Sequence, residues 1–372
     1  MSRHDAPLEV DPRQASALAS AGRPLLDVRS AAERAGGMAL GALAVDDPLD
    51  WAARTPSAEG VLLLCAMGQR SLRIASALRE RGIAAQSVAG GMAAWVGLGL
   101  PLAGDAAVVE GLTRYARQIS LPEIGATGQA RLLQARVALV GVGGLGAPAA
   151  LYLAAAGVGR ITLIDDDVVD RSNLQRQVLY SDSDVGQRKV DVAKRRLRAL
   201  NPGIDVVAIA QRLDAHNGPG FLAGHDVLVD GADNFPARFA VSDASRRLAK
   251  PMVYGAVERF AGQVAVFDPR RVESPCYRCL FPEPPAPGEV PSCAEAGVLG
   301  VVPGLIGMLQ ACETLKLLLG IGTPLVGRLL LVDALAMHWR ELVLARDVEC
   351  PGCGSSGTDS LRRASALEPG FR

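Results

Sequence analysis

The sequence predicts an α/β fold arranged as two domains followed by a short tail. Residues 137–164 read as an apolar strand, a glycine-rich turn, a helix-forming stretch and a second apolar strand. Residues 24–28 (PLLDV) and 61–65 (VLLLC) are short apolar runs of the kind that form buried parallel strands. A length of 372 residues leaves room for two domains with cores of their own. We expect the domains at 1–105 and 106–355, with a disordered tail at 356–372.

The first domain carries a cysteine loop between a strand and a helix. Residues 71–81 place their apolar side chains on one helical face, and Gly82 follows them as a C-cap glycine would. The loop before this helix begins at Cys65 and ends at Arg70. Backbone N–H groups of such a loop, together with the helix dipole, favour an anion at sulfur. The alternative is a buried structural cysteine at a strand end.

The second domain opens on a glycine turn that suits a nucleotide. Strand 137–140 runs into four glycines, helix 147–156 follows, and strand 161–164 ends on three aspartates. Glycines let the backbone approach phosphate, and the helix N-terminus offers unpaired N–H groups to it. An acid at the end of the next strand binds ribose hydroxyls in such units. The residues concerned are Gly141, Gly143, Gly144, Gly146, Asp165, Asp166 and Asp167.

A polar cluster beyond the second strand narrows the choice of nucleotide. The glycine turn alone favours a dinucleotide dehydrogenase. A hydride-transfer enzyme needs a dry nicotinamide pocket, however, and has no need of so many phosphate-seeking groups. An arginine fork and a lysine suit a triphosphate and its departing pyrophosphate. The cluster comprises Ser172, Asn173, Gln175, Arg176 and Lys189.

Four of the seven cysteines form two CxxC pairs. Cys276 and Cys279 make one pair, and Cys350 and Cys353 make the other. Four thiolates give the closed tetrahedral set of a structural Zn²⁺, which we expect here. The alternative is two unrelated turns with free thiols. The odd total argues against a closed disulfide framework and for a reducing compartment. Cys312, inside an apolar helical run, is expected to pack in the core.

Charge and apolar patterning exclude several function classes. The formal net charge is zero, so nothing points to electrostatic binding of nucleic acid. The N-terminal sequence MSRHDAPLEVDPR has no apolar signal core, and we expect a cytoplasmic protein. The uncharged run 137–159 has the glycines of a buried strand and helix, and the run 298–311 is short and interrupted by Pro303. Neither is expected to span a membrane.

Between residues 114 and 353 the chain resembles the ubiquitin-activating-type adenylyltransferases. It is most similar to the molybdopterin-synthase adenylyltransferases, followed by the sulfur-carrier adenylyltransferases of the thiamine pathway. The resemblance implies a Rossmann-like nucleotide-binding fold with a mixed, mainly parallel sheet, and the use of ATP with Mg²⁺. The matching stretches are RYARQ (114–118), GVGGLG (141–146), DDD (165–167), SNLQRQ (172–177), Lys189, DGADN (230–234), PCYRC (275–279), CAEAGV (293–298) and CPGC (350–353).

The resemblance also implies roles for individual residues. Asp233 would hold Mg²⁺, and Arg176 and Lys189 would bind the phosphates. Arg117 would reach into the ATP site of a partner subunit, which implies a homodimer. The residue types leave a helix N-cap as the alternative role of Asp233. No histidine lies in a motif, which fits adenylation because the attacking carboxylate is already ionised. The other residues implied at the ATP site are Asp165, Asp167, Ser172, Asn173, Leu174, Gln175 and Asn234.

The first domain resembles the rhodanese sulfurtransferase domain, a small α/β unit, through DVRS (27–30), CAMGQR (65–70) and VAGGMAAW (88–95). By that resemblance Cys65 carries a persulfide and Arg70 helps to hold the anion. The family often has a histidine in the turn where this chain reads Gly36-Gly37-Met38, a difference that concerns the range of substrates.

Cys293 follows the proline-rich stretch FPEPPAPGEVPS, which we expect to be a mobile crossing loop. Two interpretations remain open for this residue. Its thiol either takes part in the transfer, through an acyl group or a mixed disulfide, or is dispensable.

These observations predict adenylation of the C-terminal glycine of a small ubiquitin-like sulfur carrier (MoaD- or ThiS-like, ending in Gly-Gly). Sulfur from a Cys65 persulfide, supplied by a cysteine desulfurase or thiosulfate, would then give a thiocarboxylate for molybdopterin or thiamine-type biosynthesis. Fusion of the two domains raises the effective concentration of the sulfur donor. The rival functions are an NAD(P)- or FAD-dependent oxidoreductase, a non-catalytic carrier-binding module and a dehydratase acting on modified tRNA.

Overall fold

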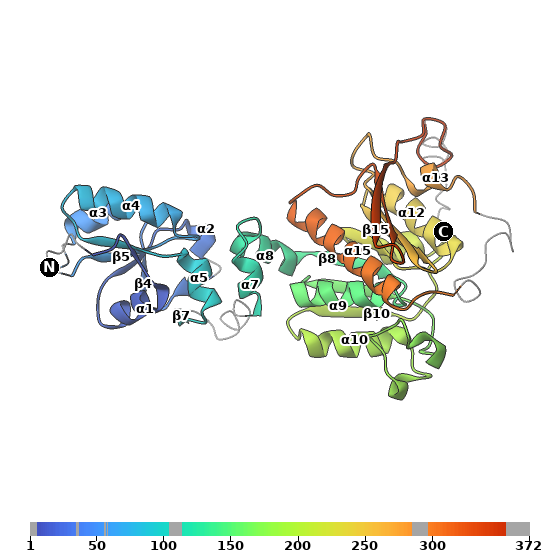
Figure 1. The fold of residues 1–372 in the computed structure, drawn as a ribbon, viewed down its shortest axis with the longest axis horizontal. Helices are drawn as coiled ribbons and strands as arrows, with labels where there is room; N and C mark the ends of the chain where they lie inside the picture. The colour runs from blue at the N-terminus through green and yellow to red at the C-terminus, as the bar shows by residue number, and fades with distance from the viewer. Residues whose placement is uncertain are drawn as a thin grey trace, which may run out of the picture. The chain divides into compact units, whose positions relative to one another are not determined.

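The computed structural model describes residues 6–34, 37–55, 57, 59–103, 114–284 and 297–354. The chain divides into two compact units, residues 1–131 and 132–372 (Figure 1). The expected domain boundary near residue 105 falls in 104–113, outside the described residues, and it stays a prediction. The tail 356–372 and Cys293 also lie outside the described residues.

A five-stranded parallel sheet with the order β1-β6-β5-β2-β4 forms the centre of the first unit. The predicted strands 24–28 and 61–65 are confirmed as β2 and β5, which pair with each other. Both faces of β5 are buried, because Leu62 and Leu64 pack in one apolar cluster and Val61 and Leu63 in another. The elements of this unit are β1 (Glu9–Val10), α1 (Pro12–Ser20), β2 (Leu25–Asp27), α2 (Ala31–Arg34), β3 (Met38–Ala39), β4 (Ala42–Ala44), α3 (Pro48–Arg54), β5 (Val61–Leu64), α4 (Gln69–Glu80), β6 (Ala85–Val88), α5 (Gly91–Gly97), β7 (Leu102–Ala103) and α7 (Ala116–Ile119), followed by α8 (Gly125–Gln134), which continues to the second unit.

Helix α4 begins two residues earlier than the predicted range 71–81. Gly68 precedes it with φ 86°, a left-handed conformation that turns the chain from the cysteine loop into the helix. Gly82, also left-handed with φ 77°, follows the helix, and its N–H donates to the carbonyl of Arg79 at 2.9 Å. The predicted glycine C-cap is therefore confirmed in its position.

The second unit contains an eight-stranded mixed sheet with the order β10-β9-β8-β11-β12-β13-β14-β15. The first five strands run parallel and the last three pair antiparallel, as predicted for a mixed sheet. The predicted strand, helix and strand of 137–164 are β8, α9 and β9. The elements are β8 (Arg136–Val140), α9 (Gly146–Ala156), β9 (Arg160–Ile164), α10 (Lys189–Leu200), β10 (Asp205–Ile209), α11 (Gly218–Leu222), β11 (Val227–Asp230), α12 (Phe235–Leu248), β12 (Met252–Glu258), β13 (Ala261–Phe267), α13 (Tyr277–Leu280), α15 (Val301–Leu319), β14 (Arg328–Asp333) and β15 (His338–Val343), with single 3₁₀ turns at Arg171–Asn173 and Asp182–Asp184.

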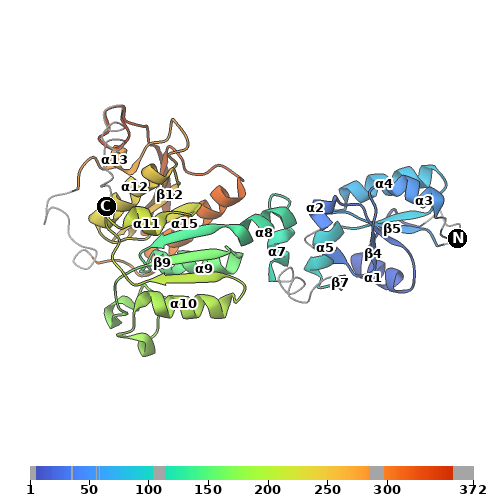
Figure 2. The same ribbon diagram turned by 180° about the vertical axis from the view of Figure 1, so that it is seen from behind.

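Helices cover both faces of this sheet (Figures 1 and 2). Alternate residues of β8 show the division: Val137 and Leu139 pack with α9 and α10, whereas Ala138 and Val140 pack with α12. Helix α15 lies against α9 and the antiparallel strands. Burial on both faces explains the continuous apolar runs from which the strands were predicted.

Helix α15 corrects two expectations. Pro303 does not interrupt the apolar run, because it is the third residue of a helix that continues to Leu319, and the first turn tolerates proline. This helix is long and apolar enough to cross a membrane, a property it shares with core helices of soluble proteins, and 44% of its most apolar window is buried. Cys312 is exposed on this helix rather than packed in the core.

Candidate functional site

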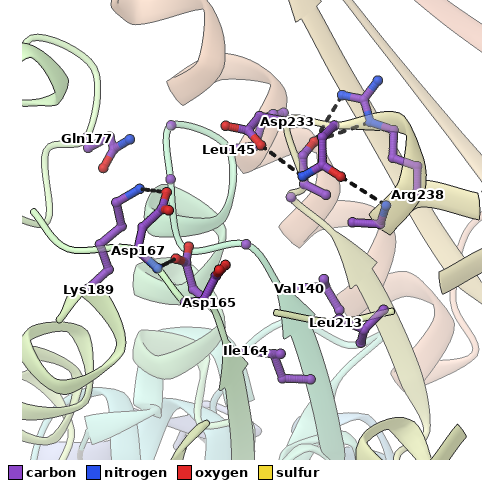
Figure 3. A pocket seen from close by; sticks show the side chains of 18 of the residues that line it. Val140, Leu145, Ile164, Asp165, Asp167, Gln177, Lys189, Leu213, Asp233 and Arg238 are labelled. Carbon is purple, nitrogen blue, oxygen red and sulfur yellow. Dashed lines mark hydrogen bonds and ion pairs between the residues drawn. The ribbon is translucent and has the colours of Figure 1, made fainter. Parts of the chain in front are cut away.

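A pocket lies at the carboxyl ends of β8 and β11. The chain leaves β8 toward β9 on one side and returns to β11 on the other, so the connections diverge here. Open α/β sheets bind ligands at this switch point. The pocket is lined by Val140, Gly141, Gly143, Gly144, Leu145, Ile164, Asp165, Asp166, Asp167, Arg176, Gln177, Lys189, Gln211, Arg212, Leu213, Gly231, Ala232, Asp233, Asn234, Ala237, Arg238, Val257, Val298 and Pro303 (Figure 3).

The glycine turn is fixed by close backbone contacts. Gly141 has φ 84°, and a Cβ there would lie 2.5 Å from the carbonyl oxygen of Gly231. A Cβ on Gly146 would overlap the carbonyl oxygen of Gly141. Gly146 therefore lets α9 approach β8 and does not itself line the pocket, unlike Gly141, Gly143 and Gly144.

The carboxylate of Asp165 braces this turn. One oxygen accepts the N–H of Val142 at 2.7 Å, and the other accepts the N–H of Asp167 at 2.9 Å. Burial raises the pKa of Asp165, while Lys189 and these two backbone bonds act in the opposite direction. The N–H of Val142 is thus already engaged, and so is that of Gly141, which donates to the carbonyl of Ile164 at 2.8 Å. A phosphate can instead approach the turn at Gly143 and Gly144, which line the pocket.

Lys189 and Arg176 are two of the four cationic side chains that line the pocket, the others being Arg212 and Arg238. The ammonium of Lys189 is bonded to Asp167 at 2.7 Å across 22 positions of sequence (Figure 3). The Lys189 side chain is only 5% exposed, whereas that of Asp167 is 58% exposed. Arg176 is half-buried, and its guanidinium donates to the carbonyl of Ser172 at 3.2 Å. Because four carboxylates (Asp165, Asp166, Asp167 and Asp233) also line the pocket, its lining carries no surplus of positive charge, and Lys189 and Arg176 would serve an anionic ligand by their position.

The loop after β11 shows that Asp233 is not the N-cap of α12, the alternative role that the sequence left open. The N-cap of α12 is Asn234, whose side-chain oxygen accepts the N–H of Ala237 at 3.0 Å. Asp233 is exposed and accepts one bond, at 3.2 Å, from the Asn234 amide. The carboxylate of Asp233 is thus not used as a helix cap and lies in the pocket with oxygen lone pairs available.

Several predicted ATP-site residues do not line the pocket. They are Gly146, Ser172, Asn173, Leu174 and Gln175, and Arg117 lies on α7 in the first unit. The hydroxyl of Ser172 donates to Asp170 at 2.5 Å. A Cβ on Gly300 would overlap the Gln175 carbonyl, so the segment packs on the start of α15. The expected contacts of all six residues with ATP stay predictions.

Four polar residues line the pocket without having been given a role from the sequence: Gln177, at the end of the SNLQRQ stretch, and Gln211, Arg212 and Arg238. The Oε1 atom of Gln177 is buried and has no hydrogen-bond partner among the described residues, so it can accept a bond from a ligand. Arg238 donates to the carbonyl of Ala232 at 3.0 and 3.2 Å and lies above Asp230. Burial raises the pKa of Asp230 to about 6. The position of Arg238, four residues after Asn234 and so on the same helix face, was the available signal.

In the first unit, Cys65 directly follows β5 and begins a tightly closed loop. Its Sγ accepts the N–H of Ser71 at 3.3 Å and the hydroxyl of Ser71 at 3.2 Å. The Cys65 carbonyl accepts the N–H of Met92 at 2.7 Å, and a Cβ on Gly91 would overlap that carbonyl. Only glycine at position 91 lets the loop dock on the start of α5. Ser71 was not singled out from the sequence, although it directly follows the loop.

Arg70 is half-exposed and bonds to Glu33 at 3.2 Å and to the Val28 carbonyl at 3.3 Å. Its pKa is raised, chiefly by the hydrogen bond to Glu33 and, among smaller causes, by the nearby Cys65. The expected role of Arg70 in holding an anion on sulfur stays a prediction. The carbonyl of Gly37, in the turn that lacks the histidine, accepts a bond from Arg29 at 2.7 Å.

The four cysteines of the CxxC pairs come together. Their sulfur atoms all lie within 4.8 Å of one another. The Sγ atoms of Cys276 and Cys350 are 3.6 Å apart, and those of Cys279 and Cys353 are 3.3 Å apart. The interpretation as two unrelated turns is therefore wrong. Four sulfurs around Zn²⁺ at about 2.3 Å would stand about 3.8 Å apart, close to this arrangement.

Comparison with known proteins finds a family match for each of the two units. The profile of the ThiF family matches residues 115–352, and that of the rhodanese-like domain matches residues 11–98. A sulfur carrier protein adenylyltransferase of Thermus thermophilus is 53% identical over 67% of this chain and 93% of its own length. The probable adenylyltransferase/sulfurtransferase MoeZ of Mycobacterium tuberculosis is 46% identical over 65% of this chain, which matches 62% of that protein.

Among solved structures, E. coli MccB with ATP is 26% identical and superposes with a TM-score of 0.56, over 64% of this chain and 74% of that one. The parallel half of the sheet, the switch-point pocket and the sequence matches point to one assignment. The chain belongs to the ThiF family and carries a rhodanese-like domain ahead of its ThiF region.

Proposed function

We propose that the chain uses ATP to adenylate the C-terminal glycine of a small ubiquitin-like sulfur carrier and then transfers sulfur to it. One observation carries the adenylation: the glycine turn, Asp165, Arg176, Lys189 and Asp233 come from separate segments and meet in one pocket. The name of the T. thermophilus relative, a sulfur carrier protein adenylyltransferase, supports the choice of substrate.

The chemistry follows from the charges in this pocket. The carrier carboxylate attacks the α-phosphate of ATP, the bond to the β-phosphate breaks, and its electron pair leaves with pyrophosphate. Lys189 and Arg176 neutralise charge on the phosphates as it shifts to the leaving group. The glycine turn and the Gln177 acceptor hold the nucleotide in place.

Asp233 fits a role in holding Mg²⁺. Its carboxylate is exposed in the pocket, is not used as a helix cap and offers the oxygen ligands that this ion prefers. A bound Mg²⁺ supplies charge neutralisation at the phosphates.

Isotope exchange between pyrophosphate and ATP tests the proposal directly. We expect exchange that depends on a carrier ending in Gly-Gly and disappears when its terminal glycine is deleted. An oxidoreductase would instead bind NAD(P)H or FAD and show no carrier-dependent exchange. A non-catalytic binding module would retain the carrier without any exchange, so these two rivals have different outcomes.

Lys189→Ala should reduce carrier-dependent exchange by about a hundredfold, because it removes a buried cation from the pocket. Lys194→Ala is the matched control, since Lys194 lies on the same helix and does not line the pocket. The measurement is the exchange rate at saturating carrier. Equal rates in the two variants would remove Lys189 from the phosphate site.

For the sulfur transfer, Cys65 is the proposed persulfide carrier, supplied by a cysteine desulfurase or by thiosulfate. The rhodanese-like match and the two donors on Cys65 Sγ support this role. The outer sulfur attacks the carbonyl carbon of the acyl adenylate, and AMP leaves. The acyl disulfide that results needs a thiol to release the thiocarboxylate, and Cys293 is the candidate within this chain. The product fits molybdopterin or thiamine-type biosynthesis.

The cysteine cluster is proposed to hold a structural Zn²⁺. Four sulfurs complete a tetrahedral set and leave no open position for substrate. The ion would join the segment of Cys276 and Cys279 to that of Cys350 and Cys353, more than 70 residues further along the chain.

Removal of this metal should strongly destabilise the second unit, because a structural Zn²⁺ site contributes on the order of 10 kcal/mol. We expect about one Zn²⁺ per chain by elemental analysis, and a lower melting temperature after chelation or in Cys350→Ser. Cys312→Ser, at an exposed cysteine outside the cluster, is the control. Full stability in a metal-free protein would contradict the assignment.

A further proposal concerns the oligomeric state. Arg117 is proposed to complete the ATP site of a second copy, so the enzyme would act as a homodimer. A monomer in sedimentation at assay concentration would exclude this.

The last proposal concerns the cellular location. The reactive thiols work only when reduced, and we propose a cytoplasmic location, which cell fractionation can test.

A further inference from the structure

The sulfur of Cys65 accepts two hydrogen bonds from a single residue, Ser71. Ser71 presents its backbone N–H at 3.3 Å and its hydroxyl at 3.2 Å. Ser71 is fully buried, and so is Ser87 on β6, whose hydroxyl lies 2.8 Å from that of Ser71. Both hydroxyls also lie within bonding distance of the Gly68 carbonyl, at 3.0 and 3.2 Å. In the cluster of Cys65, Ser71, Ser87 and the Gly68 carbonyl, Cys65 is the proposed persulfide carrier, but no catalytic or positioning role has been assigned so far to the two serine hydroxyls beside it.

A count of protons limits what this cluster can do. The two serines carry two hydroxyl protons, and each proton can be donated once. When the sulfur is a thiolate, Ser71 donates to it and Ser87 donates to the Gly68 carbonyl, so both acceptors are served. When the sulfur is a thiol, its proton can be donated to Ser71, and the serine hydroxyls turn toward each other and toward Gly68. The cluster is satisfied in either state by rotation of the hydroxyls alone.

We propose that Ser71 is a catalytic residue of the sulfurtransferase domain and that Ser87 positions its hydroxyl. The proposal deepens, and rests on, the proposed persulfide role of Cys65. In the loading step, the Cys65 thiolate attacks the outer sulfur of thiosulfate. A bond forms between the two sulfurs, the original S–S bond breaks, and its electron pair leaves with sulfite. When cyanide removes the outer sulfur as thiocyanate, the electron pair returns to Sγ, where the hydroxyl of Ser71 stabilises the charge.

Ser87 has a role because the Cys65 sulfur and the Gly68 carbonyl compete for the hydroxyl proton of Ser71. Without Ser87, the single proton of Ser71 is shared between the sulfur and the Gly68 carbonyl. Without Ser71, the sulfur keeps only the backbone N–H at position 71. Loss of either hydroxyl therefore favours the protonated thiol, and loss of Ser71 has the larger effect. The charged groups near the loop are Arg70 with Glu33 and the buried pair Asp27 and Arg29, all of which both variants keep.

The test is the pH profile of Cys65 alkylation by iodoacetamide in the full chain, followed by mass spectrometry of the Cys65 peptide. We expect Ser71→Ala to move the midpoint up by about one pH unit, a tenfold slower reaction below the midpoint, consistent with one lost hydrogen bond to a charged group. Ser87→Ala should move it in the same direction by less. Ser71→Thr, which keeps a hydroxyl, should restore the original midpoint, and Ser20→Ala, at an exposed serine of the same unit, should leave it unchanged.

Unchanged midpoints in both Ser71→Ala and Ser87→Ala would overturn the proposal. If Ser71→Ala fails to fold, the midpoint of Ser87→Ala decides alone. Thiosulfate–cyanide turnover separates this result from the persulfide role: a wild-type chain that forms no thiocyanate refutes the role of Cys65 in sulfur transfer, whereas the alkylation profile still reports on the serines. With turnover present, Ser71→Ala should lower kcat and leave KM for thiosulfate largely unchanged.

Discussion

Asp233→Ala should lower carrier-dependent exchange between ATP and pyrophosphate by at least about a hundredfold. Asp233 brings a carboxylate to a pocket that also holds Lys189 and Arg176. Without it, the pocket loses the proposed oxygen ligand for Mg²⁺ and with it the positioning of the phosphates. Asp233→Asn, which keeps the size and removes the charge, should be nearly as impaired. The measurement is the exchange rate over a range of Mg²⁺ concentrations.

The fold should survive this substitution. Asp233 is exposed, and the N-cap of α12 is provided by Asn234, so the change should alter stability by no more than about 0.5 kcal/mol. Asp191→Ala is a suitable control, because Asp191 is an exposed carboxylate of α10 that does not line the pocket. Retained exchange in a folded Asp233→Ala protein would take Asp233 out of the site.

The second large effect is expected at Cys65. Cys65→Ala should reduce thiocarboxylate formation from thiosulfate to background, because the loop has no other thiol on which the proposed persulfide can form. Adenylation should continue at the wild-type rate, since the ATP pocket is built from the second unit. Mass measurement of the carrier, which gains 16 Da when one oxygen is replaced by sulfur, reports the first reaction, and pyrophosphate release reports the second.

Cys312→Ala provides the control for this prediction, because Cys312 is exposed on α15 and lies outside both the loop and the cysteine cluster. Two outcomes would contradict the assignment. Normal thiocarboxylate formation in Cys65→Ala would make Cys65 a structural residue at a strand end. Loss of adenylation together with sulfur transfer would show that the two activities are not divided as proposed.

The sequence predicted backbone features of the site well. Strands β8 and β9, helix α9 and the two strands β2 and β5 lie where apolar runs and glycines indicated. These features depend on neighbouring residues: a glycine turn needs positive φ at Gly141, and a buried strand needs an apolar residue on each face. Pro303 misled the prediction because its effect depends on its distance from the helix start, which apolar pattern alone does not define.

Side-chain partners were less predictable. Position alone allowed either Asp233 or Asn234 to cap α12. In the segment 172–177 the sequence predicted that Arg176 faces the phosphates, but it gave no sign that Gln177 would line the pocket while Ser172 bonded to Asp170. The direction of a side chain within such a segment depends on what packs behind it. Here the start of α15, distant in sequence, supplies that packing through Gly300.

By itself, the sequence determined the α/β class, the strands and turns that carry the site, and the residue types available for ATP, sulfur and metal chemistry. Only the tertiary structure decided which of them meet. It placed Lys189 against Asp167, gathered four sulfurs from two distant segments, and set Ser71 and Ser87 around Cys65. The physical reason is the range of each signal. Backbone conformation is largely set by residues close in sequence, whereas these side-chain contacts require separate elements to pack in one arrangement.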